Sequence, residues 1–489
     1  MRRTAARFAK DEEGAILVIV AVSLGTILGM IALSYDLGRM AATTSELQSF
    51  ADHVALTAAG ELDGENGARA RAQAAATNFF TDRQTFADDN TGQVLNADDF
   101  TLTFLRSLPA LDTTAITSAN SATTDNDAVY ARVQVTPKTV PFTFGRAFFA
   151  LLGFAQRTPT FGAEAVAGFT TYACDITPMM FCMPPNFDAN TWEGRTILMR
   201  AGGNGSAWGP GDFGFLQPST LAIDSTGNCG GLSGPQGLSC VLGAAGSITQ
   251  CFRQRGVDTE PGQKNGLTNS LNTRFDMWPG DLNPARDGIV YAPAPGVIKG
   301  LVANNGNACI NNNSNPSPNT VPLPPDDCFA AGTCTRYGDG IWSTGRTNYI
   351  NTNYGTPGNP PSPVPHGSAT TRYELYLSEL AGNYSSTTPA ILPSGKAETG
   401  RPMCGAAPFP DPARRELIIA AVDCSQGTVA EDLRGSATNI PVKEYVRMFL
   451  LQPVGPAPEL SIYGEVIGSA GGNGNSGSGV FHEVVQLYR

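Results

Sequence analysis

The side chains that most often catalyse reactions or bind metals are sparse in this chain. Its 489 residues include only three histidines, His53, His366 and His482, and no two of them have the spacing of a metal-binding pair. No GxSxG segment places a serine nucleophile on a strand-to-helix turn. A Ser, His and Asp grouping assembled from distant segments stays open, but no pattern points to one. We therefore predict no catalytic residue.

Glycine-rich and acidic segments offer no stronger site. Gly472, Gly474 and Gly477 fit GxGxxG, yet too few residues follow to build the helix and second strand of a dinucleotide site, so we interpret them as a surface loop. The acidic groups at 125–127 and 326–327 lack the longer run of oxygen ligands of a calcium loop and are interpreted as solvated turns. The sequence predicts no cofactor and no metal.

Ten cysteines remain, all between residues 174 and 424. No CxxC pair suggests zinc or redox chemistry, and an even set confined to one region is typical of disulfides in an exported protein. The spacings 174/182, 328/334 and 404/424 allow local bridges, but the sequence cannot choose among the pairings. The candidate disulfide residues are Cys174, Cys182, Cys229, Cys240, Cys251, Cys309, Cys328, Cys334, Cys404 and Cys424.

An uncharged, mostly apolar run at residues 15–33 indicates on which side of a membrane those cysteines lie. About 20 helical residues span a bilayer core, and the basic residues that precede the run should keep the N-terminus in the cytoplasm. A signal peptide cleaved near Ala32 is an alternative, although the run is long for one. We expect residues 1–14 to be a cytoplasmic tail, 15–34 a single transmembrane helix, and the remainder periplasmic.

The helical pattern continues beyond the membrane, because neither proline nor a loop-like cluster interrupts residues 14–59. Apolar residues between 37 and 58 recur at three- and four-residue steps, which predicts an amphipathic helix lying on a globular head. Within the membrane run, Gly25 and Gly29 form GxxxG, a spacing that lets two helix backbones approach closely. Both are candidate helix–helix contacts, for which a second copy of the chain could be the partner.

Residues 8–59, FAKDEEGAILVIVAVSLGTILGMIALSYDLGRMAATTSELQSFADHVALTAA, resemble the N-terminal module of Flp pilus-assembly proteins of the TadE/TadG type. The resemblance rests on an acidic-glycine junction, an apolar span, a D-L-G-R exit at residues 36–39 and an alanine-rich end. It implies a bacterial inner-membrane protein of the tight-adherence (Tad) system that assembles or anchors a type IV-like pilus. The implied partners are the membrane and other Tad proteins: pseudopilins, the inner-membrane platform, and the fibre or outer-membrane channel.

One departure favours the TadG-like, unprocessed form. In processed pilins a glutamate stands five residues after the glycine junction, whereas residues 15–19 here contain no acid. A carboxylate is costly in lipid unless it is paired, so its absence suits a permanent anchor better than a fibre subunit. The D-x-S-x-S metal motif of some larger TadG-like proteins is also missing from this sequence.

The predicted fold class is α+β. Residues 35–170 should form the amphipathic helix and a small pilin-like α/β head, with helices at 68–80 and 142–154 and strands at 101–105, 128–135 and 160–170. Residues 171–489 are rich in glycine and proline and should form a mainly β, disulfide-bearing region with loops at 311–327 and 352–370. The strands expected in that region are 196–199, 288–291, 297–302, 416–422, 442–450 and 460–467.

Charge excludes one class of partner. The net charge is −11 and no basic stripe is present, so the chain should not bind nucleic acid. We expect a non-enzymatic, single-pass component for assembly or anchoring of Flp pili. The alternative is a cell-surface or periplasmic adhesin or binding protein that shares the anchor module, and a periplasmic hydrolase is a third class.

Overall fold

The chain folds into two compact units, one formed by Met1–Thr170 with Glu483–Arg489 and the other by Thr171–His482. We describe each unit by itself. The structure is a computed structural model that describes residues 13–64, 66–78, 82–84, 93–125, 127–146, 150, 158–201, 211–217, 234–245, 252–253, 256–260, 267–278, 282–305, 309–311, 314–356, 358–383, 391–393, 396, 404–405, 408–424, 437–438, 440–455, 460–472 and 481–488.

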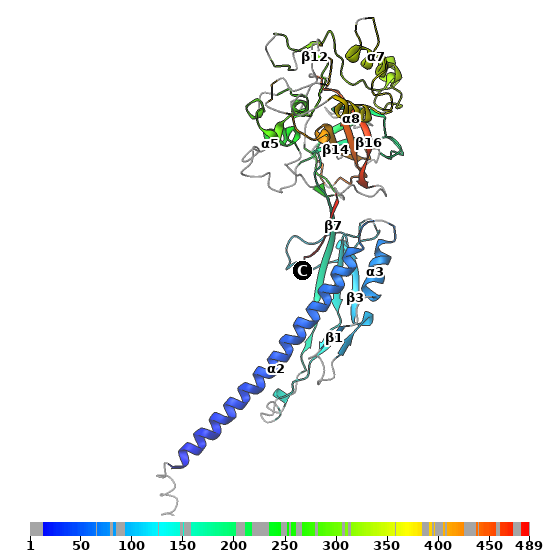
Figure 1. Ribbon diagram of the computed structural model, residues 1–489. Helices are drawn as coiled ribbons and strands as arrows, with labels where there is room; N and C mark the ends of the chain where they lie inside the picture. The colour runs from blue at the N-terminus through cyan, green and yellow to red at the C-terminus, as the bar shows by residue number, and fades with distance from the viewer. Residues whose placement is uncertain are drawn as a thin grey trace, which may run out of the picture. The chain divides into compact units, whose positions relative to one another are not determined.

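The first unit is built on one continuous helix, α2 (Glu13–Gly60), which appears as the long blue ribbon in Figure 1. At 1.5 Å per residue, its 48 residues extend for about 72 Å. Gly60 ends the helix, and the uninterrupted helix predicted over residues 14–59 is confirmed. Among the residues that the structure describes, α2 is the one helix long and apolar enough to cross a membrane.

The C-terminal half of α2 packs on an antiparallel sheet in the order β3 (Phe100–Leu105), β4 (Tyr130–Val135), β7 (Glu164–Ala173), with β17 (Phe481–Leu487) also paired to β7. Apolar residues at three- and four-residue steps along α2 meet inward-facing residues of the sheet, because both patterns place them on one face. The predicted strands at 101–105 and 128–135 are confirmed in this sheet, and so is the part of the predicted strand 160–170 from Glu164 onward. Thr160–Phe161 instead pairs with Lys138–Thr139 in a separate two-stranded sheet. Buried members of the shared core include Leu47, Phe50, Ala51, Val54, Ala58, Ala131, Val133, Ala165 and Ala167.

Smaller elements complete this unit. The helix predicted at 68–80 is confirmed as α3 (Ala68–Asn78), which buries Ala72 and Ala76 against α2. Of the helix predicted at 142–154, residues 147–149 and 151–154 lie outside the described part of the chain. The remaining elements are β1 (Asp82–Gln84), β2 (Gln93–Leu95), η1 (Ala97–Asp99), η2 (Ser118–Asn120), β5 (Lys138–Thr139) and β6 (Thr160–Phe161).

The end of the chain differs from its predicted place. We expected all of residues 171–489 to form one region, but residues 483–489 return to the first unit through β17. The Tyr488 N–H donates to the Val166 carbonyl, and the Tyr488 ring meets Tyr130 edge to face. Gly168 leaves the space for both rings, since a Cβ there would lie 2.7 Å from Tyr130 and 2.9 Å from Tyr488.

The second unit is centred on a closed six-stranded barrel. The pairs β14–β15, β15–β16, β16–β9 and β10–β8 are antiparallel, whereas β8–β14 and β9–β10 are parallel. Alternate residues of its strands fill the interior, among them Met179, Phe181, Met199, Ile419 and Met448. The strands in barrel order are β10 (Asp212–Phe215), β8 (Met179–Cys182), β14 (Glu416–Val422), β15 (Glu444–Leu450), β16 (Ile462–Gly472) and β9 (Thr196–Ala201).

Four of the six strands predicted for this region are confirmed, at 196–199, 416–422, 442–450 and 460–467. The strand predicted at 288–291 is wrong, because Ile289–Tyr291 forms the 3-10 helix η5. Of the strand predicted at 297–302, only β12 (Leu301–Val302) is a strand. Val297 and Ile298 are buried, but prolines 293 and 295 restrict the backbone here, so the apolar residues signal burial rather than pairing.

The barrel is surrounded by helices and short elements that the sequence analysis did not predict. Helices α7 (Ser343–Tyr354) and α8 (Arg372–Asn383) bury Tyr349, Ile350, Leu375 and Tyr376 in a core shared with Phe449 of the barrel. The predicted loops at 311–327 and 352–370 are largely irregular. The other elements are α5 (Gly234–Gly243), β11 (Phe252–Arg253), η3 (Leu267–Phe275), η4 (Asn283–Ala285), β13 (Asn315–Pro316), α6 (Asp327–Ala331) and η6 (Pro412–Arg415).

Disulfides connect distant parts of this unit. Cys182 is bonded to Cys424 and Cys309 to Cys404, so the local pairings 174/182 and 404/424 that the spacing allowed do not form. The third local pairing, Cys328 with Cys334, does form. Strands β8 and β14 are neighbours in the barrel, which brings Cys182 and Cys424 together across 242 residues. Cys174 and Cys240 each take part in a further disulfide. Cys229 and Cys251 lie outside the described residues.

Candidate functional site

The apolar half of α2 is the most unusual surface of the first unit. Every described side chain from Ile16 to Leu28 is exposed, with Leu17 at 75%. Gly29 and Ala32 are partly covered, and Asp36 and Arg39 are buried. These four positions follow three- and four-residue steps, so they lie on one face of the helix. That face and the segment it meets are the candidate functional site.

Asp36 and Arg39 bind residues 141–145, and we call these residues together the exit clamp. The Asp36 carboxylate accepts backbone N–H groups from Thr143 at 2.8 Å, Phe144 at 3.2 Å and Gly145 at 2.5 Å. Arg39 Nη1 donates to the Thr143 hydroxyl and to the Pro141 carbonyl at 3.4 Å. The carboxylate thus satisfies donors at the start of a helical turn, which favours an acidic group there.

The geometry of the exit clamp explains Gly145. A Cβ at that position would lie 2.9 Å from Asp36 Oδ2, so a side chain would push the carboxylate away from the N–H groups it accepts. Tyr35 adds an edge-to-face contact with Phe144, whose ring centroid is 5.2 Å away. The D-L-G-R exit seen in the sequence is therefore an attachment point for a segment more than 100 residues further along the chain.

Next to the exit clamp is a mostly apolar groove of about 610 Å³. Gly25 and Gly29 form part of one wall, and Phe142 and Gly145 contribute from the other segment. A Cβ at Gly25 would meet nothing within 4 Å, so the glycine is not required by packing within this chain. The groove can accept apolar groups from another helix. Its lining residues are Val22, Gly25, Thr26, Gly29, Met30, Ala32, Leu33, Asp36, Phe142 and Gly145.

A serine and a histidine do come together in the second unit. His366 Nδ1 lies 2.9 Å from the Ser378 hydroxyl, and the Tyr354 ring packs against the imidazole. Burial lowers the pKa of His366, with a smaller effect from the Arg346 charge. His366 Nε2 is buried without a hydrogen-bond partner in the described structure, so no carboxylate orients the ring as a catalytic triad requires. The pair is a local packing contact.

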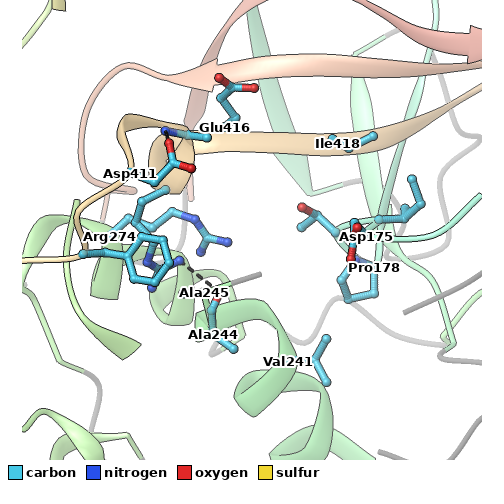
Figure 2. A pocket seen from close by; sticks show the side chains of 14 residues that line it. Asp175, Pro178, Val241, Ala244, Ala245, Arg274, Asp411, Glu416 and Ile418 are labelled. Carbon is cyan, nitrogen blue, oxygen red and sulfur yellow. Dashed lines mark hydrogen bonds between the residues drawn. The ribbon is translucent and has the colours of Figure 1, made fainter. Parts of the chain in front are cut away.

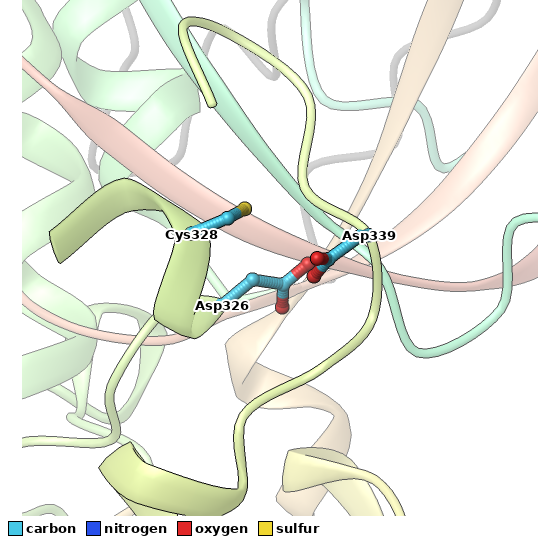
Figure 3. Close-up of side chains that lie close together, drawn as sticks. All are labelled: Asp326, Cys328 and Asp339. Atoms are coloured by element: carbon cyan, nitrogen blue, oxygen red, sulfur yellow. The ribbon is translucent and has the colours of Figure 1, made fainter. Parts of the chain in front are cut away.

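Asp326, Cys328 and Asp339 lie close together at the start of α6, as Figure 3 shows. Their chemistry does not suit a metal, because the Cys328 sulfur is bonded to Cys334 and is not a thiolate. Asp326 Oδ2 accepts the Gly340 N–H at 2.7 Å, and Oδ1 accepts the Thr196 hydroxyl at 2.9 Å. The Arg372 guanidinium also pairs with Asp326, and this carboxylate is fully buried in an internal network. The interpretation of Asp326 as part of a solvated turn is therefore wrong.

The other acidic groups singled out in the sequence also bond to the protein itself. Asp125 accepts the Gly67 N–H and pairs with Arg69 at 2.8 Å, and these bonds lower its pKa. Asp127 accepts the backbone N–H groups of Thr123 and Thr124, which hold its pKa at about 2 against the opposing effect of desolvation. Their interpretation as turn residues agrees with these bonds.

The remaining predicted positions are not part of the exit clamp. His53 is on α2, His482 is on β17, and Gly472 ends β16, while Gly474 and Gly477 lie outside the described residues. Sequence reasoning missed segment 141–145 as the partner of Asp36. No local pattern could have found it, because the bonds join residues 107 to 109 positions apart. No family model, curated protein or solved structure matches the chain.

Proposed function

We propose that this protein is a non-enzymatic, inner-membrane-anchored component that assembles or anchors Flp-type pili. The observation that carries the proposal is that the two halves of α2 differ in their surroundings. Its first half is apolar and exposed, and its second half is packed on an antiparallel sheet. A helix that leaves lipid and continues along a small sheet is the arrangement implied by the resemblance to TadG-like proteins.

Several features support an exported body behind that anchor. The described disulfide cysteines all lie beyond residue 173, and bonds of this kind persist in oxidising compartments such as the periplasm. The basic residues before α2 favour a cytoplasmic N-terminus. In this proposal the first half of α2 spans the inner membrane once, and the rest of the first unit that follows it is periplasmic, as is the second unit.

The groove beside the exit clamp gives the proposal a mechanism. Helices associate in lipid through close packing at small residues, and Gly25 with Gly29 provides such a surface. The exit clamp holds segment 141–145 next to this surface, so a partner helix would contact both. We propose that the partner is a membrane helix of another Tad component or of a second copy, while the periplasmic units contact the fibre or the outer-membrane channel.

The test is electron microscopy of pili on cells in which this gene is deleted, with the level of the fibre subunit measured by immunoblot. Complementation by the wild-type gene should restore pili. Complementation by a Gly25→Leu, Gly29→Leu variant should not, because leucines fill the groove. Ser23→Leu is the matched control, since residue 23 is exposed and lies about 200° around the helix from residue 25.

The outcomes separate the candidate functions. Loss of pili with the subunit still present supports an assembly role. Normal pili on the deletion strain contradict it and favour the adhesin alternative, which is then tested by binding of deletion cells to surfaces. Pili restored by the double-leucine variant would leave the anchor role but refute the groove as the contact with a partner helix.

A further inference from the structure

The second unit contains a cavity of about 410 Å³ that the pilus proposal does not use. It lies between the C-terminal end of α5, the segment before β8, and the start of β14. Figure 2 shows Arg274 beside Ala244 and Ala245, with Asp175 and Pro178 across the cavity. Much of the wall is apolar and comes from Ile176, Pro178, Val241, Ala244, Ala245, Phe409 and Ile418.

Two arginines line this cavity and both are buried, with 5% of Arg274 and 4% of Arg414 exposed. Within the described part of the chain, every hydrogen-bond acceptor of the Arg414 side chain is neutral. Its guanidinium donates to the carbonyls of Ala292 at 2.8 Å, Ala244 at 3.0 Å and Gly243 at 2.6 Å. Such a set of bonds fixes the side chain in position but leaves its positive charge uncompensated.

Arg274 is less satisfied than Arg414. Within the described part of the chain it makes one hydrogen bond, from Nη1 to the Leu242 carbonyl at 2.7 Å, and Nε is buried without a partner. A guanidinium has five N–H donors, so most of this one's capacity is unused. Burial lowers the pKa of Arg274 to about 10, and the side chain is therefore still positively charged at neutral pH.

The acidic residues at the cavity do not neutralise this pair. Glu416 accepts from Arg447 at 2.8 Å and from the Tyr373 hydroxyl, and Asp411 accepts the Ala413 N–H at 2.9 Å. Asp175 is exposed. Among the described residues, no carboxylate forms an ion pair with Arg274 or Arg414. Two adjacent buried cations without a counter-charge are costly, and an anionic ligand would remove that cost.

We infer that this cavity binds a small organic anion through Arg274, with Arg414 as the second positive charge. The ligand carries a carboxylate or a phosphate group, because both match the planar fork of a guanidinium. Its apolar part lies against Val241, Ile176 and Ile418. A pocket of this size suits a compact molecule rather than a polymer. This inference is independent of the role in pilus assembly.

The test is isothermal titration calorimetry of the purified full chain in detergent, with disulfides intact. The probes are benzoate and phenyl phosphate, with benzamide as the neutral analogue of benzoate. We expect benzoate or phenyl phosphate to bind and benzamide to bind at least tenfold more weakly. A preference between the two anions identifies carboxylate or phosphate as the recognised group. Equal binding of benzamide, or no binding of either anion at millimolar concentration, would overturn the inference.

Variants then locate the site. Arg274→Met should weaken anion binding at least tenfold, whereas Arg286→Gln should leave it unchanged, because the side chain of Arg286 is 43% exposed outside the cavity. Without ligand, Arg274→Met should unfold at the same temperature as wild type or higher, since it removes an unpaired buried charge. A strongly lowered unfolding temperature would show that Arg274 is a structural residue and would contradict a ligand site.

Discussion

Replacing Arg372 by methionine should strongly destabilise the second unit. The Arg372 side chain is fully buried and pairs with two carboxylates that are also fully buried, Asp326 and Glu465, the latter at 2.9 Å. Its guanidinium also donates to the carbonyls of Pro324 at 2.8 Å and Gly194 at 2.9 Å. Methionine fills similar space but leaves two buried charges without a counter-ion. Breaking a buried ion pair from one side costs about 3–5 kcal/mol, and we expect about 4 kcal/mol here.

The assay is urea unfolding of the full chain in detergent, followed by tryptophan fluorescence. All four tryptophans, at positions 192, 208, 278 and 342, belong to the second unit, so the signal reports on this unit alone. The control is Arg346→Met. The Arg346 guanidinium lies over the same Trp342 ring, at 5.8 Å compared with 4.7 Å for Arg372. The control loses a cation–π contact worth about 1 kcal/mol or less and one hydrogen bond to the His366 carbonyl, at 2.8 Å, worth about 1–2 kcal/mol, but it leaves no buried charge unpaired.

The pH dependence provides a second criterion. Burial already raises the pKa of Glu465 against the opposing Arg372 charge, and in Arg372→Met that opposition is lost, so the folded variant binds a proton at Glu465 more readily than the unfolded chain. Stability gained this way is present at low pH and is lost as the pH rises. The difference in unfolding free energy between variant and wild type should therefore be smaller at pH 5 than at pH 8. A loss below about 1 kcal/mol at pH 8, or a loss that does not change with pH, would refute the reasoning.

Two further predictions concern the same unit. Burial raises the pKa of Glu379 from 4.5 to about 7, although hydrogen bonds from Tyr349 and Tyr354 oppose the rise. The contribution of Glu379 to the free energy of unfolding is therefore full at low pH and is lost as the pH rises between these two values. Stability should fall by up to about 3 kcal/mol across this range, and Glu379→Gln, but not the exposed Glu374→Gln, should flatten the pH profile measured by urea unfolding. The Cys182–Cys424 bridge spans 242 residues, and the loss of loop entropy predicts that removing it lowers the free energy of unfolding by about 5 kcal/mol. The Cys328–Cys334 bridge spans 6 residues, and removing it should cost about 2 kcal/mol. Equal losses for the two paired Cys→Ser variants in thermal unfolding would contradict the loop argument.

Parts of the fold with a strong local pattern could be predicted from the sequence. The helix over residues 14–59 has unbroken helical periodicity, and ELIIAAV at 416–422 is the kind of apolar run that a buried strand requires. Helix α7 shows why other parts could not. Its sequence STGRTNYINTNY contains few strong helix formers, and it is helical because Tyr349 and Ile350 pack in a core built from distant segments.

Some residues of the candidate site could likewise be predicted from the sequence, and others could not. Gly25, Gly29, Asp36 and Arg39 stand within one recognisable stretch, so the helix face could be proposed from the sequence. Segment 141–145 could not, because its contact with Asp36 depends on how the sheet returns the chain to the helix. The pairing of Cys182 with Cys424 likewise follows from the neighbouring barrel strands β8 and β14 and not from sequence spacing.

The pairing of β17 with β7 makes the second unit an insertion within the first. The chain leaves the first unit after Thr170 and re-enters it at Glu483, so two covalent tethers connect the units. A mechanical load applied to the inserted unit therefore passes into two strands of one sheet rather than through a single linker. An insertion of this kind can also be exchanged without disturbing the first unit, because both of its junctions lie on neighbouring strands.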